Sequence, residues 1–188
     1  GVGCGLYGML MLVIITVFVS GLMVGRTPEY LGKKIEPFEM KMAATSVLIV
    51  PLLVLLCTAL AAISIHAIEH LGNPGAHGFT EMLYAFTSMT ANNGSAFAGL
   101  DANNWFYNII GGLVILVGRY WIVIPILAIA GSLATKKNIP VTAGTLATHT
   151  PLFTALLLSI ILIIGALSFL PALALGPIAE HLLLWKSV

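Results

Sequence analysis

The peptide that decides how this sequence should be read is TSMTANNGSAF, residues 87–97. It contains two asparagines and a glycine, which are poor helix formers, yet long apolar segments lie on both sides of it. A lipid bilayer offers no hydrogen-bond partners to exposed non-helical backbone. This peptide therefore needs an explanation that a chain of ordinary membrane helices does not supply.

The composition indicates an integral membrane protein. Hydrophobic residues make up 59% of the chain, charged residues only 8%, and the mean hydropathy is +1.05. Soluble domains carry about 25% charged residues, so this chain lacks the polar surface that water requires. The net charge of +1 does not bear on nucleic-acid binding, but the chain has no basic run with interleaved aromatic residues, so we expect no nucleic acid as a partner.

Four apolar segments are long enough to cross a bilayer, which takes about 20 helical residues. Pro51 predicts a kink in the second of them. The four predicted spans are residues 6–24, 42–68, 106–133 and 152–175.

Lysine and arginine concentrate in cytoplasmic loops, and they separate the loops of this chain. The loop 69–105 contains neither residue type, whereas loops 25–41 and 135–148 together contain six of the eight basic residues. We therefore predict that loops 25–41 and 135–148 face the cytoplasm, and that loop 69–105 and the C-terminus are extracytoplasmic.

The connection between the second and third spans predicts a re-entrant element. Residues 79–89 indicate a helix that is too short to span the membrane, the polar peptide 90–95 follows it, and 96–105 leads back to the third span. The order of span, half-helix, polar peptide and span is typical of a pore loop. The predicted fold class is therefore all-α: a polytopic membrane protein of span–pore loop–span architecture, with four transmembrane helices plus one re-entrant pore half-helix.

The polar peptide has the composition of an ion filter. Non-helical backbone at membrane depth is tolerated where it lines a water-filled cavity, and potassium filters place carbonyl oxygens there in place of the ion's hydration shell. Such a backbone needs positive φ angles, which glycine and asparagine tolerate. The alternative is an ordinary extracellular Asn-Gly turn with a glycosylation sequon at Asn93. The predicted filter residues are Thr90, Ala91, Asn92, Asn93, Gly94 and Ser95.

Arg119 is the single charge within the third predicted span. An arginine at the bilayer centre costs about 2.5–3.5 kcal/mol on insertion scales, so it should face protein or a water-filled cavity and have a partner. We expect this partner to be a carbonyl, a water or a carboxylate outside the chain. Below a cation filter, Arg119 would oppose leak by repulsion; the alternative is a structural arginine bonded to carbonyls of a neighbouring helix.

The end of the first span is a second candidate gate. Gly21, Gly25, Arg26 and Thr27 would form a break in the helix that lines the lower half of a pore. The alternative is a plain helix cap, with Gly25 at the C′ position and Pro28 preventing continuation of the helix.

The sequence His66-Ala-Ile-Glu69-His70 matches H-x-x-E-H, an inverted zinc-protease motif. On a helix, the two histidines would share one face, and His77 or Glu81 would supply a third ligand. This predicts an intramembrane zinc hydrolase as an alternative function. The motif also lies where a membrane helix leaves the lipid, a natural place for polar residues.

Several ordered motifs, from one end of the chain to the other, carry a resemblance to a known family. The chain resembles the potassium-binding subunit of the Kdp potassium-transporting P-type ATPase of bacteria and some archaea. The motifs are GLYGM, GLMVGRTPEYLGKKIE, NPGAHGFTE, ANNGSAFAGL, VGRYWIVIPILAIAGSL, GTLATHTPLF and GALSFLPALALGPIAEHL.

The resemblance implies a channel-like fold with four span–pore loop–span repeats, of which this chain holds the C-terminal part. It implies the second span of repeat three with its cytoplasmic loop in 1–41, repeat four in 42–134, and a cytoplasmic loop with a final transmembrane helix in 135–188. Residues 90–95 would be the fourth filter strand, and Arg119 the cation below it. We expect the chain to be a fragment of a longer subunit, because one strand cannot surround an ion.

The resemblance also implies the partners. They are a P-type ATPase catalytic subunit, small single-span subunits and membrane lipid in a bacterial or archaeal inner or plasma membrane. Potassium would be the transported ion, with no cofactor and no other metal. The chain has no D-K-T-G phosphorylation motif, so we expect no catalytic residues and no enzymatic activity of its own. A purely structural membrane subunit is the remaining alternative.

Overall fold

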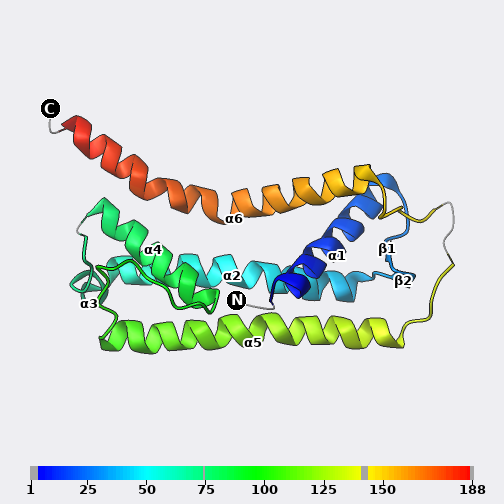
Figure 1. Cartoon of the computed structure of the whole chain (residues 1–188), viewed down its shortest axis with the longest axis horizontal. Coiled ribbons are helices and arrows are strands. Elements are labelled where there is room, and N and C mark those ends of the chain that lie inside the picture. The colour runs from blue at the N-terminus through cyan, green and yellow to red at the C-terminus, as the bar shows by residue number, and fades with distance from the viewer. Residues whose placement is uncertain (1–3, 74, 141–143, 187–188) are drawn as a thin grey trace. The chain divides into compact units, whose positions relative to one another are not determined.

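The computed structural model describes residues 4–73, 75–140 and 144–186, which are mostly helical (Figure 1). The ends of the predicted segments 1–41 and 135–188, and residues 141–143 of the predicted loop 135–148, lie outside the described residues. The elements are α1 (Cys4–Val24), β1 (Glu29–Tyr30), β2 (Lys33–Lys34), α2 (Pro37–Ile63), α3 (Ile65–Ile68), α4 (Ala76–Thr90), α5 (Trp105–Thr135) and α6 (Pro151–Lys186).

Among these described residues, four helices are long and apolar enough to cross a membrane, which agrees with the predicted all-α membrane protein with four transmembrane helices. The fourth helix differs most from its predicted bounds of 152–175, since α6 runs from Pro151 to Lys186. The second helix, predicted at 42–68, begins at Pro37 and ends at Ile63. Proline is tolerated in a first helical turn, so the helix starts early. Ser64 adopts an extended conformation, with φ −91° and ψ 120°, and separates α2 from the short helix α3.

The described residues form two compact units, each with its own core. The first unit comprises residues up to 48 together with 121–165, and the second comprises 49–120 together with the residues from 166 onward. The predicted division into 1–41, 42–134 and 135–188 follows the implied repeats and stays a prediction.

In the first unit, α1 is packed on a core of aliphatic side chains. Val17 and Ala43 are fully buried and Ile35 is almost so. A two-stranded antiparallel hairpin, β1 and β2, follows α1 and pairs Tyr30 with Lys33. Its two turn residues both have positive φ, as a two-residue hairpin turn requires; Gly32 adopts this conformation readily, but Leu31 (φ 52°) does so rarely.

The first unit contains an ion pair between the buried Glu39 and Lys136. The Glu39 side chain is fully buried and accepts hydrogen bonds from Lys136 Nζ (2.8 Å), Ser132 Oγ and the backbone N–H of Glu36 (2.8 Å). Lys136 also donates to the carbonyl of Lys34 (3.1 Å) and pairs with Glu36 (3.1 Å). Lys136 therefore joins the loop before α2 to the loop after α5.

In the second unit, α4 is buried against α2, α5 and α6. Phe86 is fully buried with Tyr107 of α5 beside it, at 5.9 Å between ring centroids. Leu83 packs with Val54 and Ala172. The helix α4 is therefore held on several sides by apolar contacts.

The second half of α6 also contacts α4 closely. A Cβ atom placed on Gly176 would lie 2.2 Å from Thr80 Oγ1 and 3.3 Å from the Ala76 carbonyl oxygen. His77 Nδ1 lies 3.0 Å from Glu180 Oε1 beside this contact. Glycine at 176 is therefore what permits the two helices to approach at this level.

We predict that Lys136→Ala lowers the free energy of unfolding by about 3 kcal/mol, because it leaves the buried Glu39 carboxylate without its cation. Burial alone would lower the pKa of Lys136, but its hydrogen bonds to Glu39 and Glu36 outweigh burial and raise it above 10.5. The raised pKa means that this stabilisation is fully present at neutral pH and is lost only as the pH rises through the folded-state pKa.

Thermal and denaturant unfolding of the detergent-solubilised full-length subunit measures this effect. Lys137→Ala is the matched control, because Lys137 is the exposed neighbouring residue. Equal stability of the two variants would contradict the prediction.

Candidate functional site

The helix α4 ends inside the stretch that the sequence analysis assigned to a filter. It spans 15 residues, Ala76–Thr90, against the predicted 79–89. Thr90 is its last residue, and Ala91 keeps helical angles (φ −75°, ψ −2°) as the C-cap. The chain then leaves the helix and runs back toward the start of α5 without regular structure (Figure 1).

Two of the next residues have left-handed backbone angles, Asn92 (φ 60°) and Gly94 (φ 74°). Asparagine and glycine are the residue types that tolerate this conformation best. Between them, Asn93 Oδ1 accepts hydrogen bonds from the Ser95 backbone N–H (2.9 Å), Ser95 Oγ (2.8 Å) and Ser88 Oγ. The side-chain oxygen of Asn93 therefore stabilises the turn.

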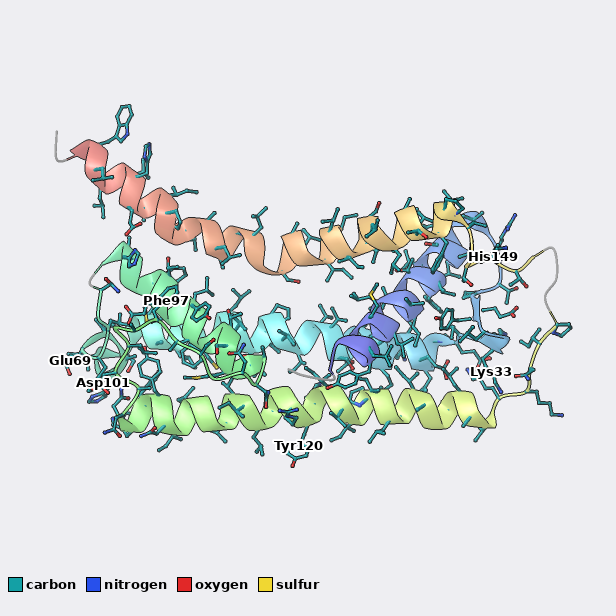
Figure 2. The ribbon with its side chains drawn as sticks, in the orientation of Figure 1. Lys33, Glu69, Phe97, Asp101, Tyr120 and His149 are labelled. Atoms are coloured by element: carbon teal, nitrogen blue, oxygen red, sulfur yellow. The ribbon has the colours of Figure 1, made fainter. Side chains whose placement is uncertain are left out.

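The returning peptide is attached to α4 by further side chains, while its other side is uncovered. Tyr84 Oη lies 2.8 Å from Ser95 Oγ, and its ring stacks on Phe97 at 4.6 Å with an interplanar angle of 3°. Figure 2 labels Phe97 beside α4. Residues 93–99 are all exposed. The peptide therefore contacts α4 on one side and is exposed on the other.

Arg119 contacts this peptide directly. Its Nε donates to Asn92 Oδ1 (3.2 Å), and Asn92 Nδ2 donates in turn to the Thr90 carbonyl (3.1 Å). The predicted partner was a carbonyl, a water or a carboxylate outside the chain; the observed partner is the side-chain amide oxygen of a predicted filter residue within the chain. A Cβ on Gly118 would lie only 2.6 Å from the Thr90 carbonyl oxygen, so glycine allows α5 to approach the end of α4 here.

The contact places a positive charge at the C-terminal end of α4. Unpaired carbonyls give that end of a helix a partial negative charge, and a cation there is stabilising. The guanidinium itself is exposed. Arg119 therefore fixes the Asn92 amide and also presents its charge beside the peptide.

Glu81 is a buried residue whose structural role the sequence analysis missed. Its carboxylate is fully buried within α4 and accepts hydrogen bonds from the backbone N–H groups of Gly72 and Asn73 (both 3.2 Å) and from Asn73 Nδ2 (3.1 Å). The sequence did contain a signal for this role: Glu81 lies in the middle of a short, mostly apolar helix, and a buried carboxylate needs hydrogen-bond donors.

The histidines of the H-x-x-E-H motif have separate contacts. His70 Nδ1 pairs with Asp101 Oδ2 (3.1 Å), whereas the His66 ring lies edge-on to Trp105 at 5.3 Å. His77, considered as a third ligand, pairs with Glu180. Across residues 4–73, 75–140 and 144–186, no three His, Cys, Asp or Glu side chains are placed to share a metal ion.

Asp101 is held by two partners at the far end of the peptide. The backbone N–H of Asn103 (3.0 Å), and then the His70 side chain, lower the pKa of the Asp101 carboxyl below 3.8. A lowered carboxyl pKa adds stability that is present above pH 3.8 and is lost as the pH falls through the folded-state pKa. The Asp101 carboxyl group is therefore ionised at neutral pH.

The Gly21–Thr27 region forms a regular helix end. The Arg26 N–H donates to the Gly21 carbonyl (2.7 Å) and the Gly25 N–H to the Leu22 carbonyl (3.2 Å), with Gly25 at φ 69°. These two bonds are the Schellman motif, so the predicted cap is confirmed. The Thr27 N–H donates to Gly144 (3.1 Å) in the loop after α5. The gate assignment of Gly21, Gly25, Arg26 and Thr27 stays a prediction.

Comparison with known proteins supports the sequence motifs. Residues 1–182 match the family model described as potassium-transporting ATPase A subunit. Proteins named potassium-transporting ATPase potassium-binding subunit are similar over almost the whole chain: 60% identical in Ralstonia nicotianae over 97% of the chain, 60% in Dechloromonas aromatica over 100%, and 65% in Herpetosiphon aurantiacus over 98%.

The chain spans only part of these relatives, 31% of the Ralstonia protein and 32% of the other two. Within that part, the match includes α4, the peptide after it, and Arg119. The chain belongs to the potassium-transporting ATPase A subunit family.

Proposed function

We propose that this chain supplies one quarter of a potassium filter in the potassium-binding subunit of an ATP-driven import complex. Residues 90–95 form one filter strand, which selects potassium from the extracytoplasmic side through backbone carbonyl oxygens. The proposal is supported by the names of the relatives, which are potassium-binding subunits. The chain spans about a third of their length, so the other filter strands belong to the rest of the subunit.

The observation that carries this proposal is the uncovered peptide that follows α4. It begins at the end of a buried half-helix, contains left-handed Asn92 and Gly94, and is exposed through residues 93–99. In the proposed filter, the left-handed conformation of these two residues lets carbonyl oxygens of the strand point toward the ion. Such oxygens replace the hydration shell of potassium when several strands surround the ion.

Arg119 is the gating cation in this proposal. Its contact with Asn92 (3.2 Å) supports this role, because it holds a positive charge beside the peptide; in the proposed orientation that charge lies on the cytoplasmic side of the filter strand. Two unit charges 4 Å apart repel by about 4 kcal/mol at an effective dielectric constant of 20. Arg119 therefore prevents free leak through the pore, and potassium leaves toward the ATPase subunit instead.

The remaining assignments follow from the same proposal. The chain itself is non-catalytic, and a P-type ATPase subunit hydrolyses ATP while small single-span subunits stabilise the complex. Loops 25–41 and 135–148 face the cytoplasm, because they carry the basic residues. The segment from Gly21 to Thr27 is a helix end at the cytoplasmic side of the pore.

We predict that substitutions at Gly94 weaken discrimination of potassium from sodium in the order Val, Ala, Asn, with Val the most severe. No atom lies within 4 Å of a Cβ placed there, so the effect comes from the positive φ. A non-glycine residue in this conformation costs about 1–2 kcal/mol, and asparagine tolerates it best. Potassium uptake by the full complex, across a range of potassium and sodium concentrations, measures the effect.

Gly112→Ala is the control for the Gly94 series. A Cβ on Gly112 also has no atom within 4 Å, but this glycine lies inside helix α5. Unchanged ion discrimination in all three Gly94 variants would remove the filter assignment and favour a purely structural subunit.

We predict that Arg119→Ala and Arg119→Gln raise passive potassium leak or uncouple transport from ATP hydrolysis, whereas Arg119→Lys keeps leak low. Lysine retains the positive charge, and glutamine retains only a hydrogen-bond donor. Ion flux in proteoliposomes containing the full complex, with and without ATP, separates leak from pumping.

Tyr120→Ala is the positional control, because Tyr120 is 58% exposed and projects outward from α5 (Figure 2). Passive leak in Arg119→Gln as low as in the wild type would show that the positive charge of Arg119 does not prevent leak. The role of Arg119 would then be limited to holding Asn92.

A further inference from the structure

The chain between α3 and α4 is attached to the pore half-helix through one carboxylate. Glu81 lies one turn into α4 beyond Gly78, is fully buried, and receives N–H groups from Gly72 and Asn73 only eight or nine residues earlier. A buried carboxylate that lost these donors would be left uncompensated. The loop 72–73 is therefore held firmly against α4.

Three glycines bring this loop into contact with both of its neighbours. A Cβ on Gly72 would lie 2.4 Å from Gly99 Cα and 2.7 Å from the Gly99 carbonyl oxygen. A Cβ on Gly78 would lie 2.4 Å from the Asn73 carbonyl oxygen. Side chains at these positions would force the backbones apart. The loop thus touches α4 on one side and the returning peptide at Gly99 on the other.

A second contact attaches the same loop to the returning peptide. The backbone N–H of Asp101 donates to the His70 carbonyl (3.0 Å), and the two side chains pair at 3.1 Å. Figure 2 labels Asp101 close to Glu69 at this end of α5. The returning peptide is therefore fixed at both ends, by Asn92 and Asn93 near α4 and by the loop at Gly99 and Asp101.

We propose that Glu81 is a positioning residue for potassium selection, acting through this clamp. This clamp consists of Glu81, the loop 72–73 and Gly99. The proposal rests on the filter function proposed above. Glu81 holds the loop, the loop holds Gly99, and Gly99 limits how far the peptide 93–98 moves. A filter that must match one ion needs its backbone held within a fraction of an ångström. Loosening the clamp therefore reduces affinity and selectivity for potassium.

The test uses Glu81→Gln in the full complex. The substitution keeps shape but replaces one acceptor oxygen with an NH₂ group that faces the N–H donors of the loop. We expect the potassium concentration for half-maximal transport to rise about tenfold, the equivalent of about 1.4 kcal/mol. The maximal rate of ATP hydrolysis at saturating potassium stays within about twofold, and discrimination against sodium falls.

Glu69→Gln is the matched control. It removes an exposed carboxylate from the same side of the second unit, outside the clamp, and leaves affinity and selectivity unchanged. A merely structural role for Glu81 would lower the amount of assembled complex without changing the affinity or ion discrimination of the complex that remains.

Gly99→Ala provides a second route, because it breaks the clamp without touching the carboxylate. A Cβ there would lie 2.8 Å from Gly72 Cα, so the loop and the peptide must separate. We expect the same loss of potassium affinity and selectivity as in Glu81→Gln. If Glu81→Gln prevents assembly, Gly99→Ala decides the question alone.

Wild-type affinity and sodium discrimination in assembled Glu81→Gln or Gly99→Ala complexes would overturn the clamp. If the Gly94 variants nevertheless lose selectivity, the filter function stands and only the clamp is wrong. If the Gly94 variants are also unaffected, the filter function itself is wrong.

Discussion

A chain that leaves a helix within a bilayer must find partners for its backbone N–H and C=O groups in protein or water, because lipid supplies none. In the non-helical peptide after α4, side chains pair with backbone groups: the Ser95 N–H donates to Asn93 Oδ1 and the Thr90 carbonyl accepts from Asn92 Nδ2. Arg119 in turn holds the Asn92 side chain. In the second unit, the close approaches at Gly72, Gly99 and Gly118 bring this irregular peptide against the loop before α4 and against α5.

The sequence predicts the helices of this fold well, because lipid imposes both their length and their composition. A short helix before the polar peptide was also predictable, because the segment is too short for a span, and α4 occupies that position. Local exceptions were not. Leu31 at positive φ runs against residue preference, and the extended Ser64 ends α2 inside an apolar run that reads as continuous helix.

Some features of the candidate site could likewise be predicted from the sequence, and others could not. Residue types indicated unusual backbone at Asn92, Asn93 and Gly94; Asn92 and Gly94 have positive φ, whereas Asn93 does not and accepts hydrogen bonds through its side chain instead. The partners of Arg119 and Glu81 could not be predicted, because each depends on where a loop comes to lie in three dimensions. Asn92 reaches Arg119 only because Gly118 admits the end of α4 so closely. The carboxylate of Glu81 is satisfied by backbone donors, which every residue except proline possesses and no motif reveals.

The contact between α6 and α4 has a consequence for the order in which the molecule is assembled. His77 and Thr80 are synthesised long before Glu180 and Gly176, their neighbours in the folded unit. Domains generally fold during synthesis from the N-terminus onward. Until α6 has been synthesised, α4 therefore lacks its contacts with Gly176 and Glu180, and a nascent chain halted before Gly176 would leave that side of α4 uncovered for recognition by a chaperone or a protease.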